Sequence, residues 1–257
     1  LNATYFRVAI PTGLCLGGAA LVQALAFNFN ASPTNQAFLE NLSCLVVPVI
    51  LFFVIKKKPT ILTVSACFIC LLSSMVLSGI FSESVVFSPA DILNALAGVL
   101  YGVNIALTGI YAKKFVASLY VMLQLFIQAI LSLLMAVAFH FLTIGSTPID
   151  RFVFTFDPWL ILSLVALGVI SNALCWTIRT NAMKYVSANV VAVIMPFSAV
   201  ITGILAVLGG QDKPTLSLLI GAILGITASL LSAVGDIKEK KQEESSIMIN
   251  NITPNKP

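Results

Sequence analysis

Eight apolar runs fill most of the sequence, and each is long enough to cross a lipid bilayer as a helix. A spanning helix needs roughly 20 mostly apolar residues. Helices are expected because backbone groups in lipid must be hydrogen-bonded within their own segment. The runs cover about 8–29, 36–55, 60–81, 91–112, 116–141, 158–178, 186–208 and 215–235. We therefore predict an all-α membrane protein of about eight transmembrane helices.

Charged residues make up only 9% of the 257 residues. A soluble domain has about 25%, because its surface faces water. The remaining apolar surface is expected to face a lipid bilayer. The formal net charge of +4 is small and gives no support to nucleic-acid binding.

The placement of the positive charges predicts the orientation of the chain. With eight spans, both chain ends lie on one side of the membrane. Of the 14 Lys and Arg residues, all except Arg151 and Lys213 fall on that side. Such a bias marks the cytoplasmic side. We therefore predict a multi-pass plasma-membrane protein with both termini in the cytoplasm, and a disordered cytoplasmic tail at 237–257.

Apart from Asp91, the first residue of the run at 91–112, Glu40 is the only acidic residue inside a predicted span. An ionisable group in lipid is costly and by default marks a functional site. Glu40 is therefore a candidate for solute binding and for proton or ion coupling. It lies about five residues into its helix, so an interfacial carboxylate that reaches the outer water remains an alternative.

Three stretches resemble the EamA branch of the drug/metabolite transporter superfamily. The first is 35–43, NQAFLENLS, which is similar to the start of the fourth helix of a family repeat. The second is 91–102, DILNALAGVLYG, which is similar to the opening helix of the second repeat. The third is 185–189, YVSAN, which leads on to the final helix at 219–225, LIGAILG.

The resemblance implies an inverted-repeat bundle. Family members usually have ten spans in two inverted five-helix repeats. This chain would hold the last three spans of the first repeat, at 1–85, and all five of the second, at 86–236. The first two family helices have no counterpart, and the first residue is Leu1. The chain is therefore expected to be a piece of a longer protein.

The resemblance also implies which polar residues line the central cavity. Asn104, Asn172 and Trp176 lie on helices that line the cavity in relatives, and they are candidates for solute binding. Residues 172 and 176 are four apart, so they share a helix face. No catalytic residue, metal site or cofactor is predicted, because the one CxxC pair, Cys67 and Cys70, has no second pair or nearby His.

Proline and glycine positions add expectations about helix shape. Pro48 and Pro196 lie inside predicted spans and are predicted helix breaks. The GxxxG pairs at 98–102 and 221–225 permit close helix contact. That contact could serve packing within the chain or a homodimer, and the sequence leaves both open.

The leading functional hypothesis is a secondary transporter that works by alternating access. No GxxxxGK[ST] motif is present, so the energy is expected to come from a gradient. Lys and Arg are nearly absent from the span centres, which favours a neutral, zwitterionic or cationic solute. The resemblance implies export of an amino-acid-like metabolite or a drug.

Other functions fit the sequence less well. An intramembrane enzyme needs a catalytic constellation, and one His with one intramembrane Glu does not supply it. A channel would show a filter-like loop or a ring of charges. A non-transporting or truncated membrane scaffold of the same fold remains the alternative.

Overall fold

The computed structural model describes residues 3–29, 39–56, 59–77, 89–142, 157–195, 201 and 216–252. These residues form helices and contain no strand. The helices are α1 (Ala3–Asn28), α3 (Ser43–Ile55), α4 (Ile61–Leu77), α5 (Pro89–Tyr111), η1 (Ala112–Lys114), α6 (Ala117–Leu142), α7 (Pro158–Val165), η2 (Ala166–Cys175), α8 (Trp176–Ala182), α9 (Ala188–Ile194) and α11 (Leu216–Ile252).

Each of the eight predicted runs contains a helix, which confirms the all-α membrane fold class. Five helical stretches within the described residues are long and apolar enough to span a bilayer. They are Thr4–Ala26, Pro89–Lys114, Ala117–Ala138, Pro158–Ala182 and Leu219–Glu239. Two shorter apolar helices cover Ser43–Ile55 and Ile61–Val76. In the run at 186–208, α9 ends at Ile194, and most of the rest, including Pro196, lies outside the described residues.

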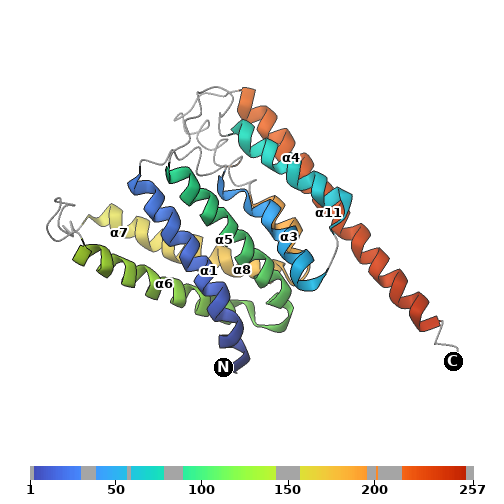
Figure 1. The fold of residues 1–257 in the computed structure, drawn as a ribbon, viewed down its shortest axis with the longest axis horizontal. Helices are drawn as coiled ribbons and strands as arrows, with labels where there is room; N and C mark the ends of the chain where they lie inside the picture. Colours follow the sequence, from blue (N-terminus) through green and yellow to red (C-terminus); the bar gives the residue numbers. More distant parts are fainter. Residues whose placement is uncertain are drawn as a thin grey trace.

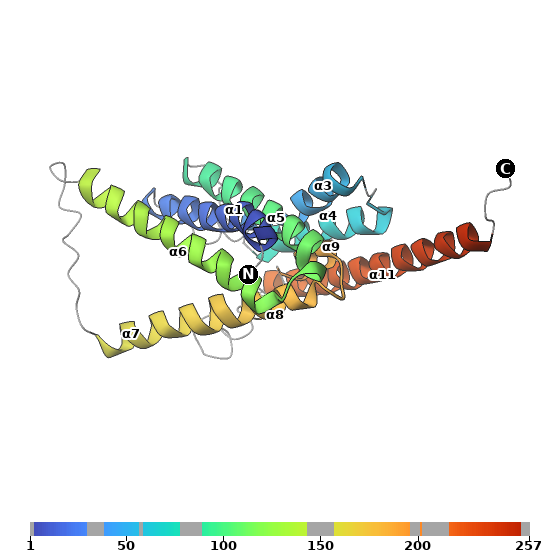
Figure 2. The ribbon, with the colours of Figure 1, turned by 90° about the horizontal axis from the view of Figure 1, so that it is seen from below.

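The helices form a bundle with α1 near its middle (Figure 1). α1 packs against α5 and α6, and α3 packs on α5. At one edge α4 pairs with α11, whose C-terminal half extends away from the bundle (Figure 1). α6 meets α8 at one end and diverges from α7 at the other (Figure 2). The two termini lie along the same edge of the molecule (Figure 1).

One continuous helix is formed by α7, η2 and α8. Its start is fixed by Asp157, whose side chain accepts a hydrogen bond from the backbone N–H of Trp159 at 3.0 Å, and by Pro158 in the first turn. Its middle, η2, is a π-helix, a rare form that is frequently found at functional sites. The helix continues to Ala182, beyond the end that we predicted at 178.

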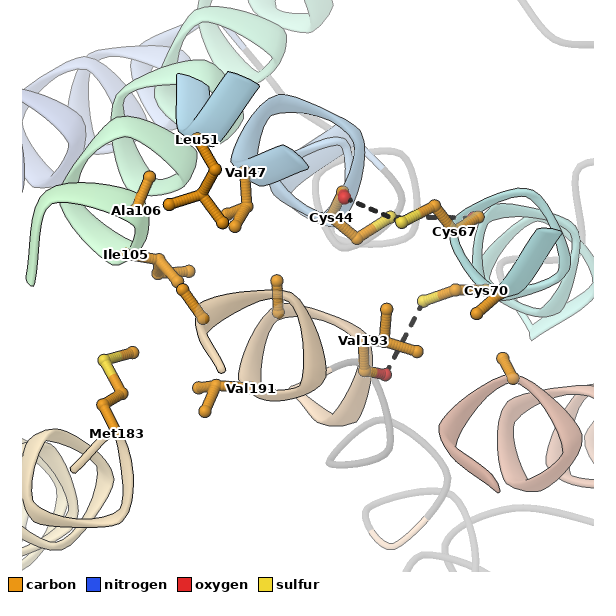
Figure 3. Packing of buried hydrophobic residues seen from close by; sticks show 14 of the residues in the cluster. Cys44, Val47, Leu51, Cys67, Cys70, Ile105, Ala106, Met183, Val191 and Val193 are labelled. Atoms are coloured by element: carbon orange, nitrogen blue, oxygen red, sulfur yellow. Dashed lines mark hydrogen bonds between the residues drawn. The ribbon is translucent and has the colours of Figure 1, made fainter. Parts of the chain in front are cut away.

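The largest cluster of buried apolar side chains lies between α3, α4, α5, α9 and α11 and contains three cysteines (Figure 3). Cys70 donates from its thiol to the backbone oxygen of Val193 at 3.8 Å. Small thiols let neighbouring helices approach closely while still offering a weak donor. The CxxC residues Cys67 and Cys70 therefore help pack α4 against α3 and α9, and both are free thiols.

α3 runs without interruption through Pro48, so the break that we predicted there is not present in this structure. Proline lacks a backbone N–H, and its position frees the carbonyl of the residue four places earlier, Cys44. The thiol of Cys67 donates to that Cys44 oxygen at 3.1 Å (Figure 3). The neighbouring helix thus supplies the missing donor, as membrane prolines require.

The residues at 237–252 also differ from the prediction. We expected a disordered tail, whereas α11 continues to Ile252. Neither Gly nor Pro interrupts 237–252, and the segment is rich in Lys, Glu and Gln, which are good helix formers. Charge alone led us to predict disorder, although helix propensity in this segment is high.

Gly98 brings α5 against the segment before α3, and Gly102 brings it against the first turns of α3. A Cβ at Gly98 would collide with the backbone oxygen of Leu39 and would lie 3.2 Å from that of Glu40. A Cβ at Gly102 would lie 2.6 Å from the Cβ of Val46. This GxxxG pair therefore serves packing within the chain.

We predict that Gly98→Ala lowers the free energy of unfolding by about 1–3 kcal/mol, because backbone atoms cannot move aside as a flexible side chain can. The measurement is thermal unfolding of the purified protein in detergent. Gly168→Ala is the matched control, since nothing lies within 4 Å of its added Cβ. Equal unfolding temperatures for the two variants would contradict the close contact between α5 and the segment before α3.

Candidate functional site

A line of polar and aromatic side chains joins the segment before α3 to α1, α5 and α8. At its first end the amide nitrogen of Gln23, on α1, donates to the carboxylate of Glu40 at 3.1 Å. The hydroxyl of Tyr101, on α5, donates to the amide oxygen of Gln23 at 3.1 Å. The side-chain amide of Gln23 therefore links the carboxylate of Glu40 to the hydroxyl of Tyr101.

The other end of the line is a cation on α8. The guanidinium carbon of Arg179 lies 3.4 Å from the centre of a Trp176 ring, a close cation–π contact. One Nη of Arg179 donates to the side-chain oxygen of Asn104 at 3.3 Å, and the other lies 3.8 Å from the sulfur of Met195. The rings of Tyr101 and Trp176 have centroids 6.5 Å apart, so the two ends are connected through aromatic side chains.

Helical spacing explains why these residues meet. Tyr101 and Asn104 are three apart on α5, and Trp176 and Arg179 are three apart on α8. Residues at this spacing share a helix face. Two such faces turned toward each other give the contacts of Trp176 with Tyr101 and of Arg179 with Asn104.

Asn104 is fully buried and holds three helices together. Its amide nitrogen donates to the backbone oxygen of Thr12 on α1 at 2.8 Å, while its oxygen accepts from Arg179 on α8. The hydroxyl of Tyr120, on α6, donates to the Thr12 hydroxyl at 2.8 Å. Asn104 therefore has both its donor and its acceptor engaged, and it positions Arg179.

The two charges in the line have neutral partners. Among the described residues, Glu40 bonds to an amide, and Arg179 contacts an amide, a thioether and an aromatic ring. The buried Nε of Arg179 has no hydrogen-bond partner there. A charge without a counter-charge in a low-dielectric interior attracts an opposite charge strongly. The line can therefore bind ionic groups of a small molecule.

The predicted site residues are only partly brought together. Glu40, Asn104 and Trp176 all lie in the line. Asn172 does not, because its amide nitrogen donates to the backbone oxygen of Leu167 at 3.1 Å, inside the π-helical segment of its own helix. Its role in solute binding stays a prediction.

Arg179 and Gln23 are the residues that the sequence analysis missed. Arg179 was assigned to the cytoplasmic side, beyond a span that ended at 178, but it lies inside the apolar stretch Pro158–Ala182. Lys and Arg are nearly absent from the predicted span centres, but this arginine lies near the end of its stretch and contacts Trp176 and Asn104. Its three-residue spacing from Trp176, a predicted cavity residue, was the signal that could have identified it.

A separate pocket of about 510 Å³ lies between α3 and α4. Its lining is apolar and consists of Leu45, Pro48, Val49, Phe52, Phe53, Pro59, Val64 and Cys67. Specific binding of a polar solute needs a few well-placed polar groups. The polar line, and not this pocket, is therefore the candidate site.

We predict that Asn104→Ala lowers the free energy of unfolding by about 1–2 kcal/mol, because Arg179 loses an acceptor and the Thr12 carbonyl loses a donor. Asn172→Ala is the matched control and should cost less than about 0.5 kcal/mol, since its amide bonds only to its own helix. Thermal unfolding in detergent compares the two variants. A larger loss for Asn172→Ala would show that Asn104 does not hold the helices.

Comparison with known proteins assigns this chain to a family. The search of curated proteins found no match, whereas 29 chains of solved structures match. One of them, a crystal structure of a protein, is 18% identical, has a TM-score of 0.73 and covers 89% of this chain and 78% of its own, so it shares the fold. The family model described as the EamA-like transporter family matches residues 92–234, which lie within the predicted second repeat. This match covers more than half of the chain, which therefore belongs to the EamA-like transporter family and is an integral membrane transporter.

Proposed function

We propose that this protein exports a small amino-acid-like solute by alternating access, driven by a proton or ion gradient. Membership of the family supports membrane transport of a small molecule. The observation that carries the choice of solute is the Glu40 carboxylate, which is held by the neutral amide of Gln23. A carboxylate without a cationic partner is suited to bind the ammonium group of a solute.

Glu40 is also the proposed coupling residue. A carboxylate in a poorly hydrated place can release its proton when an ammonium group arrives and recover it when the solute leaves. Solute and proton would then compete for one site, which is the basis of exchange. The amide of Gln23 and the hydroxyl of Tyr101 would reorganise with each change of charge, because Gln23 donates to this carboxylate and Tyr101 donates to Gln23.

The aromatic and amide groups between the charges are proposed to bound the solute path. Tyr101 and Trp176 face each other with ring centroids 6.5 Å apart and offer apolar surface to a solute side chain. Asn104 keeps the α8 end of the line in place through its bond to α1. Asn172, the second residue in the second half of the π-helical segment, is proposed to reach the path when that segment changes its winding.

The helix Pro158–Ala182 is the proposed moving element. None of the residues of α7 or η2 is buried in the described bundle, so few contacts resist displacement of this half. A π-helical segment has a looser hydrogen-bond pattern and is a frequent site of bending. Bending at η2 would move α8, with Arg179 and Trp176, relative to α1 and α5.

We predict that Glu40→Gln lowers the uptake of amino acids into proteoliposomes by on the order of tenfold or more, because a charge-assisted bond is replaced by a neutral one. The residual flux should lose its dependence on pH. Asp157→Asn is the control, since Asn is also a good N-cap and the residue lies at a helix end. Unchanged flux with unchanged pH dependence would remove Glu40 from both roles. A folded wild-type protein without any flux would favour the scaffold alternative.

We further propose that the protein lies in the plasma membrane with both termini in the cytoplasm. Positive charges follow α3 at Lys56 and α5 at Lys113 and Lys114. These helix ends lie along the edge that also holds the termini (Figure 1), and positive charge marks the cytoplasmic side.

We predict that Lys56→Cys and Lys238→Cys react with a membrane-impermeant maleimide only after cells are permeabilised, whereas Asp157→Cys reacts in intact cells. The wild-type chain, with its own thiols, gives the background. Labelling of Lys56→Cys and Lys238→Cys from opposite sides would contradict an even number of spans between them.

A further inference from the structure

Arg179 is a cation inside a membrane helix, and its described partners leave its charge uncompensated. Its guanidinium stacks on Trp176 at 3.4 Å and bonds to the oxygen of Asn104 at 3.3 Å. Both contacts stabilise a cation, but neither supplies a negative charge. An ion that is buried without a counter-charge is expensive, so such an ion in a carrier indicates a partner that comes and goes.

One edge of the guanidinium is available for that partner. The Nε atom is buried and has no hydrogen-bond partner among the described residues. The Nε–H and one Nη–H of an arginine point along the same edge in parallel. This pair matches the two oxygens of a single carboxylate, which accepts both bonds at once. Stacking on Trp176 occupies a face of the guanidinium and not an edge. Each Nη carries two hydrogens, so the Nη that donates to Asn104 has a second one for a carboxylate.

We propose that Arg179 binds the carboxylate group of the transported solute. The inference rests on the proposed function, because it assigns the second ionic group of the same solute whose ammonium group is assigned to Glu40. Tyr101 connects the two charges, because its hydroxyl donates to Gln23, which holds Glu40. Its ring centroid lies 6.5 Å from that of Trp176, on which Arg179 stacks. Of the three solute classes that the sequence allowed, this selects the zwitterionic one.

A carboxylate fits Arg179 better than a phosphate does. A phosphate monoester carries about −1.5 to −2 charges near neutral pH. The described part of the line contains one guanidinium and no second Lys or Arg that bonds to it. One carboxylate neutralises one guanidinium, whereas a phosphate would leave negative charge next to the aromatic rings.

Trp176 and Asn104 act as positioning residues for this site. Trp176 fixes the plane of the guanidinium, because the two groups are stacked and sit three apart on one helix. Asn104 fixes the rotation of the guanidinium within that plane, because its oxygen accepts a hydrogen bond from one Nη. The amide nitrogen of Asn104 in turn donates to the backbone oxygen of Thr12. A preorganised cation of this kind binds an anion without the cost of ordering a flexible side chain.

The test is ligand binding by the purified full chain in detergent, measured as the rise in unfolding temperature. Each standard amino acid is compared with its carboxamide, which keeps the ammonium group but has no carboxylate, and with its aminophosphonate analogue. The variants are Arg179→Lys, which keeps the charge but loses the paired donors, and Arg179→Met. Arg7→Lys and Arg7→Met are the matched controls, since Arg7 is an exposed arginine on α1.

The expected result is that one or more amino acids stabilise the wild type and both Arg7 variants, while the matching carboxamide and aminophosphonate do not. Arg179→Lys should raise the dissociation constant by roughly 30-fold or more, and Arg179→Met should abolish stabilisation. If Arg179→Met does not fold, the Arg179→Lys result decides.

The proposal is overturned if no amino acid stabilises the wild type, if carboxamides or phosphonates bind as well as carboxylates, or if Arg179→Lys binds like the wild type. This readout is independent of flux. Binding through Arg179 without transport would defeat the proposed function alone. Amino-acid flux with an unchanged KM in Arg179→Lys would defeat the present inference alone.

Discussion

The contact of the Arg179 guanidinium with Trp176 and Asn104 is the constraint around which the centre of the bundle is arranged. A cation within an apolar helix must be surrounded by protein groups, because lipid offers none. Trp176 supplies a ring face from the same helix, and Asn104 supplies an oxygen from α5. Since Asn104 also donates to Thr12 of α1, the position of one charge determines how α1, α5 and α8 meet.

The same requirement, that no polar group be left bare in lipid, explains the packing of the remaining helices. Pro48 frees the carbonyl of Cys44, and the thiol of Cys67 occupies it from the neighbouring helix. On α4 the hydroxyl of Ser73 donates to the backbone oxygen of Gly221 on α11 at 2.7 Å. Small residues at these contacts let a side chain on one helix reach the backbone of the next. A lipid environment therefore favours small residues at these contacts, and it favours those whose thiol or hydroxyl can donate to a neighbouring backbone oxygen.

The sequence predicted what depends on local pattern and missed what depends on distant partners. Apolar run length predicted the helices, and GxxxG spacing predicted the close approach at Gly98. Glu40 was identified as a candidate because a carboxylate stands out in an apolar run, whereas Asn104 and Trp176 were candidates that the family resemblance implied. Arg179 was missed because a charge near a helix end normally marks the end of the span. Its acceptor, Asn104, lies 75 residues earlier, and that contact has no signature along the chain.

The contacts of Arg179 also differ in how they respond to motion of its helix. Trp176 sits on the same helix three residues away, so the stacking moves with Arg179 and survives any displacement of α8. The bond to Asn104 crosses between helices and must break when α8 moves away from α5. A guanidinium that loses this acceptor needs another, and a carboxylate on the solute would be a partner that travels with it. Under the proposed mechanism, an empty carrier would therefore resist the movement that a loaded carrier makes.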